Sequence, residues 1–265
     1  KNGFLFSPPI CLKSDKTSQC RERLKSLRWS EGVKCPRCQG EKHAYDSRRY
    51  VWDCYSCGYQ FSVLTGTIFH DTHLPLPKWF LAIYIMIESK KGVSANQMKR
   101  MLHVSSKTAW YLCHRIRAAM TELATAPMTG TVEVDETYIG GKVRGKGKGY
   151  IGNKAVVVGA VQRGGMIRLE RAEGNNRAIL TGFVHKHTDG TAKVYTDEHA
   201  GYDLIRRDHS KVSHKAEEWV RGDIHTQTIE SVWSLFKRSV IGSYHKVSEK
   251  HLDAYLDELE WRQNN

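Results

Sequence analysis

The pattern of hydrophobic and polar positions divides the chain into three stretches. The middle stretch, from about residue 78 to residue 117, has the spacing of helices. Between residues 78 and 89 nearly every side chain is apolar, which predicts a helix that is buried on most sides. Ser94 to Gln97 has the form of a capping box and predicts a second helix ending near Leu102. Ser105 can cap a third helix, whose inward stripe at helical spacing is Ala109, Leu112, Cys113 and Ile116.

The C-terminal half alternates strand patterns with helix patterns. Strands are expected over 131–138, 155–162, 167–171 and 192–196, and helices over 176–184, over 228–239 and from Glu249. This order predicts a mixed sheet with helices on its faces. Residues 141–149 (GKVRGKGKG) are too rich in Gly and Lys for a packed element and predict a basic loop.

Two cysteine pairs stand near the start of the chain, Cys35-Pro36-Arg37-Cys38 and Cys54-Tyr55-Ser56-Cys57. A two-residue gap lets both thiolates of a pair reach one ion, so the spacing predicts a four-cysteine zinc ribbon with a structural role. The alternative is a set of disulfides or free thiols. An odd total of 7 cysteines and the lack of a recognisable signal peptide favour zinc. Short strands around the pairs and a basic helix from Cys20 to Trp29 complete the expected module.

The charge balance points to a polyanionic partner. Lys and Arg total 41 against 28 Asp and Glu, which gives a formal net charge of +13. The third helix of the middle stretch concentrates basic and aromatic side chains at Lys107, Tyr111, His114, Arg115 and Arg117. A short helix, a tight turn and a basic helix predict a helix-turn-helix that contacts DNA; an ordinary helical linker domain is the alternative.

Three acidic residues stand where the hydrophobic pattern does not favour them. Asp135 interrupts a strand, Asp197 ends another, and Glu230 lies at the start of a helix. Gathered together they would repel one another unless a cation lay between them. Oxygen ligands favour Mg²⁺ or Mn²⁺, and two such ions can drive phosphodiester chemistry. The alternative for each single acid is an ordinary surface charge or a helix cap.

Glu133, Glu136 and Glu198 compete with these three acids. Side chains alternate along a strand, so Glu136 should face away from Asp135, while Glu133 shares its face and stays open as a candidate. We expect Glu133→Gln and Glu198→Gln to retain activity.

Five stretches resemble one family, the bacterial insertion-sequence transposases with an N-terminal zinc ribbon and an Asp-Asp-Glu catalytic domain, a group related to the eukaryotic Merlin transposons. They are Thr65 to His70, Lys107 to Trp110, Val132 to Lys142, Tyr195 to Asp197 and His225 to Glu230. The resemblance implies an RNase H-like catalytic fold and cut-and-paste DNA transposition. It also implies that Asp135, Asp197 and Glu230 are the catalytic, magnesium-binding acids and that Lys237 is a further basic catalytic position. His103 stands where the family turn usually has Gly, and Gln227 replaces a more common Asn.

These observations predict an α+β multidomain protein. Residues 1–70 would hold the basic helix and the zinc ribbon, 71–126 the helix-turn-helix, and 127–265 the RNase H-like domain with its basic loop 141–149. The expected function is a DNA transposase that binds inverted-repeat transposon ends, cleaves with two metal ions and transfers strands to target DNA. A domesticated DNA-binding regulator and a metal-dependent nuclease are the alternatives. Further DNA contacts are expected at Lys142, Arg144, Lys146, Lys148, Arg238, His245 and Lys246.

Family analogy implies a homodimer or a larger synaptic assembly. No apolar run reaches the ~18 residues of a membrane helix. We therefore expect no membrane partner and a cytoplasmic location at the bacterial nucleoid, or a nuclear one in a eukaryote.

Overall fold

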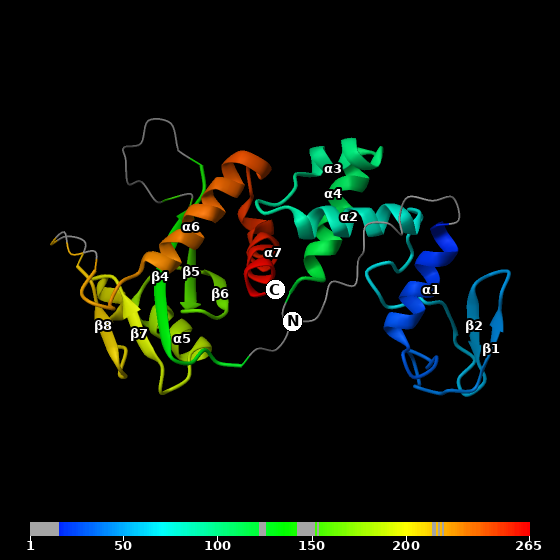
Figure 1. The fold of residues 1–265 in the computed structure, drawn as a ribbon, viewed down its shortest axis with the longest axis horizontal. Coiled ribbons are helices and arrows are strands. Elements are labelled where there is room, and N and C mark those ends of the chain that lie inside the picture. The colour runs from blue at the N-terminus through cyan, green and yellow to red at the C-terminus, as the bar shows by residue number, and fades with distance from the viewer. Residues whose placement is uncertain are drawn as a thin grey trace. The chain divides into compact units, whose positions relative to one another are not determined.

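A computed structural model describes residues 16–121, 126–141, 152, 154–213, 216, 218 and 220–265. The chain divides into two compact units (Figure 1). The first comprises residues up to 88 together with 95–119, and the second comprises 89–94 together with 120–265.

The first unit begins with helix α1 (Lys16–Arg28) and a three-stranded antiparallel sheet of β1 (His43–Asp46), β2 (Val51–Cys54) and β3 (Gln60–Phe61). The helix is bound to the sheet through aromatic packing, since the Trp29 ring lies 5.1 Å from that of Trp52 and 5.9 Å from that of Phe61. The Arg28 guanidinium donates to the carbonyl of Val63 at 2.8 Å. The basic helix predicted from residue 20 therefore forms and is part of the ribbon module.

Three helices follow in this unit, α2 (Leu76–Glu88), α3 (Ala95–Leu102) and α4 (Ser106–Ala118). The Ser105 hydroxyl caps α4 as predicted, because it accepts from the Thr108 amide at 3.1 Å. The predicted stripe of α4 is buried. His103, in the turn between α3 and α4, has a φ of +51°. Glycine adopts that left-handed conformation most easily, which accounts for the Gly that the family usually has at this turn.

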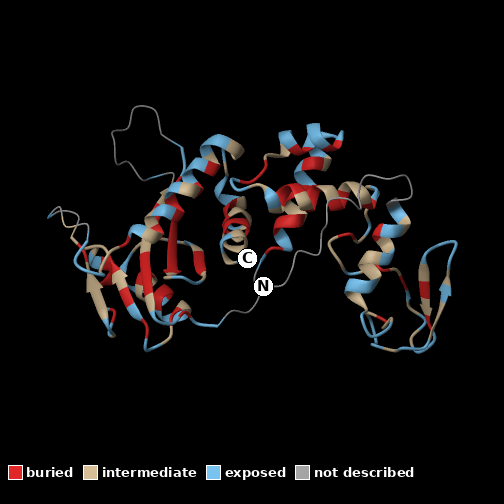
Figure 2. Ribbon diagram, in the orientation of Figure 1, coloured by how far each residue is buried: buried red, intermediate tan, exposed pale blue. Residues whose placement is uncertain are grey.

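The second unit is built on a five-stranded sheet of order β6-β5-β4-β7-β8. Strand β4 (Thr131–Ile139) pairs antiparallel with β5 (Ala155–Gln162), which pairs antiparallel with β6 (Ile167–Ala172). On its other side β4 pairs parallel with β7 (Lys193–Thr196), and β7 pairs parallel with β8 (His209–Lys211). The mixed sheet is as predicted, and β4 and β5 at its centre are largely buried (Figure 2).

Helices cover both faces of this sheet. Helix α5 (Arg177–His187) and the short turn η2 (Ala200–Tyr202) pack on one face with Val132 and Val134 of β4. Helices α6 (Gln227–Ser239) and α7 (Leu252–Asn264), joined through the turns η4 (Val240–Tyr244) and η5 (Glu249–His251), pack on the other. Odd-numbered residues of β4 therefore face α6, and even-numbered residues face η2. No helix among the described residues is long and apolar enough to cross a membrane.

Candidate active site and zinc centre

The four predicted zinc ligands converge in the first unit. The sulfur atoms of Cys35 and Cys57 lie 3.7 Å apart, those of Cys38 and Cys54 lie 3.6 Å apart, and all four lie within 4.8 Å of one another. A tetrahedral zinc site with Zn–S bonds of about 2.3 Å has sulfur–sulfur edges of about 3.8 Å. The six cysteines in the described part of the chain are all free of disulfides. The quartet therefore fits one structural Zn²⁺.

The two cysteine pairs sit on matching turns. The amide of Gln39 donates to the carbonyl of Cys35, and the amide of Gly58 donates to the carbonyl of Cys54, each at 2.9 Å. Gln39 and Gly58 occupy the same place in their turns and both have positive φ, +61° and +66°. These turns aim both sulfur atoms of each pair at one point, which is the geometry that a two-residue gap requires.

Asp135 lies on β4, the central strand of the second unit, and its side chain faces α6. Its Oδ2 atom accepts a hydrogen bond from the Trp233 indole nitrogen at 3.0 Å. Burial, followed by the negative charges of Glu136 and Asp197, raises the pKa of Asp135 to about 7. A bound cation would lower this raised pKa and so return the carboxyl group to its ionised form.

Helix α6 presents Glu230 and Lys237 to the same hollow, which has a volume of about 470 Å³. Glu230 lies in the first turn of the helix, and its Oε1 atom accepts from the Thr226 hydroxyl at 2.9 Å. The lining residues of this hollow are Asp135, Glu136, Thr137, Glu230, Trp233, Ser234, Lys237, Arg238 and Ile241. Two predicted acids and the predicted basic position thus meet at one surface.

Asp197 follows β7, beside Asp135's strand, but is not among the residues that line the hollow. Its Oδ1 atom accepts from the backbone amide of His199 at 2.9 Å, which fixes the turn after the strand. Within the described part of the chain, the cysteine quartet alone brings three or more ligand atoms within 4.8 Å of one another. The three acids are therefore spaced more widely than the cysteines, although the charge of Asp197 acts on Asp135.

The competing acids fall into different environments. Glu136 faces away from Asp135, as predicted, and accepts from the Tyr202 hydroxyl at 2.7 Å. Glu198 is half-buried. Glu133 shares the face of Asp135 but is completely buried, with its oxygens occupied by α6 and by Arg163.

Comparison with known proteins supplies the family. A family model described as the ISXO2-like transposase domain matches residues 127–264, which is more than half of the chain. The chain belongs to this transposase family. A second model, the transposase zinc-ribbon domain, matches residues 16–60. A protein of Halobacterium salinarum, described as an uncharacterized protein in transposable element ISH50, is 30% identical over 264 residues, covering 90% of this chain and 88% of its own.

The DNA contacts expected for the transposase are distributed unevenly. On α4, Lys107 and Tyr111 are exposed, while His114 and Arg115 are partly exposed; the Arg115 guanidinium donates to the Tyr111 hydroxyl at 2.7 Å. Arg117, the remaining expected contact on this helix, is only 2% exposed. It falls on the buried side of the helix, next to Ile116.

Four of the expected contacts, Lys142, Arg144, Lys146 and Lys148, lie outside the described residues. Arg238, His245 and Lys246 are exposed. Trp110, which was not among the expected contacts, is 43% exposed, and its ring lies 4.2 Å from that of His114. An aromatic residue within a basic helix is the signal that could have identified it.

Proposed function

We propose that this chain is a DNA transposase that binds the inverted-repeat ends of its element, cleaves a strand there and transfers it to target DNA. The observation that carries the proposal is the hollow in which Asp135 and Glu230 lie with Lys237 and Arg238. Carboxylates beside exposed cations suit a reaction on a phosphodiester, whose phosphate needs positive charge. Membership of the transposase family supplies the biological context.

We infer that the second unit is an RNase H-like domain. Counted within the unit, its strands have the order 3-2-1-4-5, and the acids lie on the first strand, after the fourth and on the helix that covers them. This arrangement would bring residues from distant parts of the chain together beside the carboxyl end of β7, a place where open sheets commonly bind ligands.

Asp135, Asp197 and Glu230 would hold the catalytic Mg²⁺ or Mn²⁺ ions. Burial, followed by the negative charges of Glu136 and Asp197, raises the pKa of Asp135 to about 7, and the donors are all hard oxygen atoms, so the site would suit such a cation. Held by these residues, a pair of such ions would supply activation of the attacking oxygen and stabilisation of the leaving oxygen. The chain's own contribution is positional: Lys237 and Arg238, on the face of α6 that carries Glu230, would hold the DNA phosphate in the hollow.

End recognition is assigned to the first unit, with α3 and α4 as a helix-turn-helix. The exposed side of α4 combines Lys107, Trp110, Tyr111 and Arg115, which offers cations for phosphates and aromatic rings for bases. Arg115→Ala should weaken end binding and lower the salt dependence of the affinity. Equal affinity for the variant and the parent across a salt series would remove α4 from the recognition surface.

The deciding experiment is strand cleavage of a labelled element end by the full chain in Mg²⁺. Asp135→Asn and Glu230→Gln should abolish cleavage and transfer while end binding survives, because each removes a ligand charge and keeps the shape. Glu170→Gln, a carboxylate on β6 paired with Lys186, is the control and should cleave normally. Cleavage by Asp135→Asn at the parental rate would refute the assignment. If the parent cleaved DNA without element ends as fast as DNA with them, the result would favour a nuclease. If the parent bound element ends without cleaving them, the result would favour a regulator.

A further inference from the structure

Glu133 is a buried carboxylate on the strand that carries Asp135. It is 0% exposed, and it lies on the face of β4 that packs against α6. A buried carboxylate is costly unless its oxygens are hydrogen-bonded and its charge is balanced. Its partners therefore show what it does.

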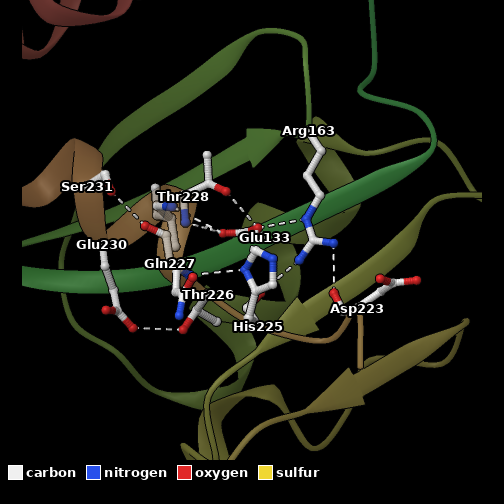
Figure 3. A network of polar contacts seen from close by, with 10 residues as sticks. Glu133, Arg163, Asp223, His225, Thr226, Gln227, Thr228, Glu230 and Ser231 are labelled. Carbon is white, nitrogen blue, oxygen red and sulfur yellow. Dashed lines mark hydrogen bonds and ion pairs between the residues drawn. The ribbon is translucent and has the colours of Figure 1, made fainter. Parts of the chain in front are cut away.

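The first set of partners is the beginning of α6 (Figure 3). Oε2 of Glu133 accepts from the backbone amides of Thr228 and Ile229 at 2.8 and 3.2 Å, and Oε1 accepts from the Thr228 hydroxyl at 2.8 Å. Helix α6 begins at Gln227, so these amides belong to the first turn, where no carbonyl of the helix can accept from them. The residue at the N-cap position, Thr226, makes no side-chain capping bond. Glu133 supplies that cap from the sheet, with a negative charge at the positive end of the helix.

The second set of partners is cationic and polar, and it fixes the segment that enters the helix. The Arg163 guanidinium donates to Oε1 of Glu133 at 2.8 Å, and it also donates to the carbonyls of Asp223 at 2.7 Å and His225 at 3.3 Å. The His225 ring lies 3.3 Å from the same carboxylate oxygen. Glu133 and Arg163 thus join the sheet to both the approach and the first turn of α6.

Glu230 comes directly after Ile229 in this anchored first turn. We propose that Glu133 is a positioning residue, which fixes the start of α6 so that Glu230 is set against Asp135. The inference rests on the proposed function of that site. With both oxygens occupied by donors, Glu133 does not itself reach the hollow, and it is not a further metal ligand. The expectation that Glu133→Gln is neutral is thereby replaced, because an amide has one acceptor oxygen and would turn an NH₂ group toward either the helix amides or Arg163.

The test compares Glu133→Gln and Thr228→Val with the parent, and uses Glu170→Gln as the matched charge-removal control on another strand. Glu133→Gln should slow single-turnover cleavage of pre-bound end DNA by about 10- to 100-fold and move the Mg²⁺ midpoint upward, with end affinity unchanged. Thr228→Val removes one hydrogen bond and keeps the shape, so its rate should fall by about 5-fold.

Two readouts do not depend on cleavage. Amide exchange of Thr228 and Ile229 should be faster in Glu133→Gln than in the parent and unchanged in Glu170→Gln. Mn²⁺ affinity of the protein alone should fall in Glu133→Gln. Parental cleavage, parental exchange and parental Mn²⁺ affinity in a folded Glu133→Gln protein would overturn the proposal.

The two remaining outcomes also test the positioning role of Glu133. If Glu133→Gln does not fold, Thr228→Val takes its place, and parental rate and exchange in that variant overturn the positioning role. If the parent itself does not cleave end DNA, the proposed function fails, while exchange and Mn²⁺ binding still decide whether Glu133 anchors the helix.

Discussion

Asp135, the proposed metal ligand, is held in the fold at an electrostatic cost. Burial, with the charges of Glu136 and Asp197, raises its pKa from the ordinary 3.8 to about 7. Between those values the folded protein holds a proton that the unfolded chain has lost, so stability falls as pH rises through this window and stays lower above it. The difference corresponds to at most about 4 kcal/mol in the metal-free protein.

Asp135→Asn should therefore stabilise the metal-free protein at pH 8, because the amide imitates the protonated acid. At pH 4 its melting temperature should match that of the parent. Adding Mg²⁺ should raise the melting temperature of the parent and have a smaller effect on the variant. Scanning calorimetry at both pH values measures this, and a variant less stable than the parent at pH 8 would show that the carboxylate is not under electrostatic strain.

At the scale of elements, the site depends on how closely α6 approaches the sheet. Gly159 of β5 is the residue paired with Asp135 across the two strands. A Cβ atom on Gly159 would lie 2.6 Å from the Trp233 ring and 2.9 Å from the Leu169 side chain. The absence of a side chain there lets Trp233 lie on the sheet and donate to Asp135.

Gly159→Ala should destabilise the protein by about 1–3 kcal/mol, because Trp233 and α6 must move away from the sheet. Cleavage should fall as well, since Trp233 holds Asp135. Gly182→Ala is the control: Gly182 lies in α5 with open space around it, and alanine should stabilise that helix by up to about 1 kcal/mol. Denaturant unfolding measures both, and equal stability of the two variants would contradict the close approach of α6.

The sequence predicted elements better than it predicted their contacts. Strand β5 and the end of α6 lie where the hydrophobic pattern placed them, since that pattern follows a buried face. Strand β8 was missed, because its three residues at the sheet edge are only half-buried and show no apolar alternation. The role of Glu133 was not predictable, because its partners lie near residue 228 and only the fold brings them to β4. Arg117 illustrates the same limit, because composition marks it as basic but does not indicate that it is 2% exposed.

At the scale of the molecule, the second unit and the ribbon part of the first unit differ in the size of their apolar clusters. The second has two apolar clusters, one on each face of its sheet. The ribbon has one small cluster in which Cys35 and Cys54 are themselves buried members, beside Trp52, Phe61 and Val63. So small a core does not hold a fold without a further constraint, and here that constraint is the metal.

Removing zinc should therefore unfold the ribbon and leave the second unit folded. A strong chelator should abolish the near-ultraviolet circular dichroism signal that arises from Trp29 and Trp52, because their packing against α1 depends on the two cysteine turns. Unfolding of the sheet in the second unit should keep its midpoint, since neither of its clusters contains a zinc ligand. Restoring Zn²⁺ should recover the signal, and Cys38→Ser should reproduce the loss without chelator. An aromatic signal that survives complete removal of zinc would show that the ribbon core is stable by itself, and end binding that also survived would separate the ribbon from DNA recognition.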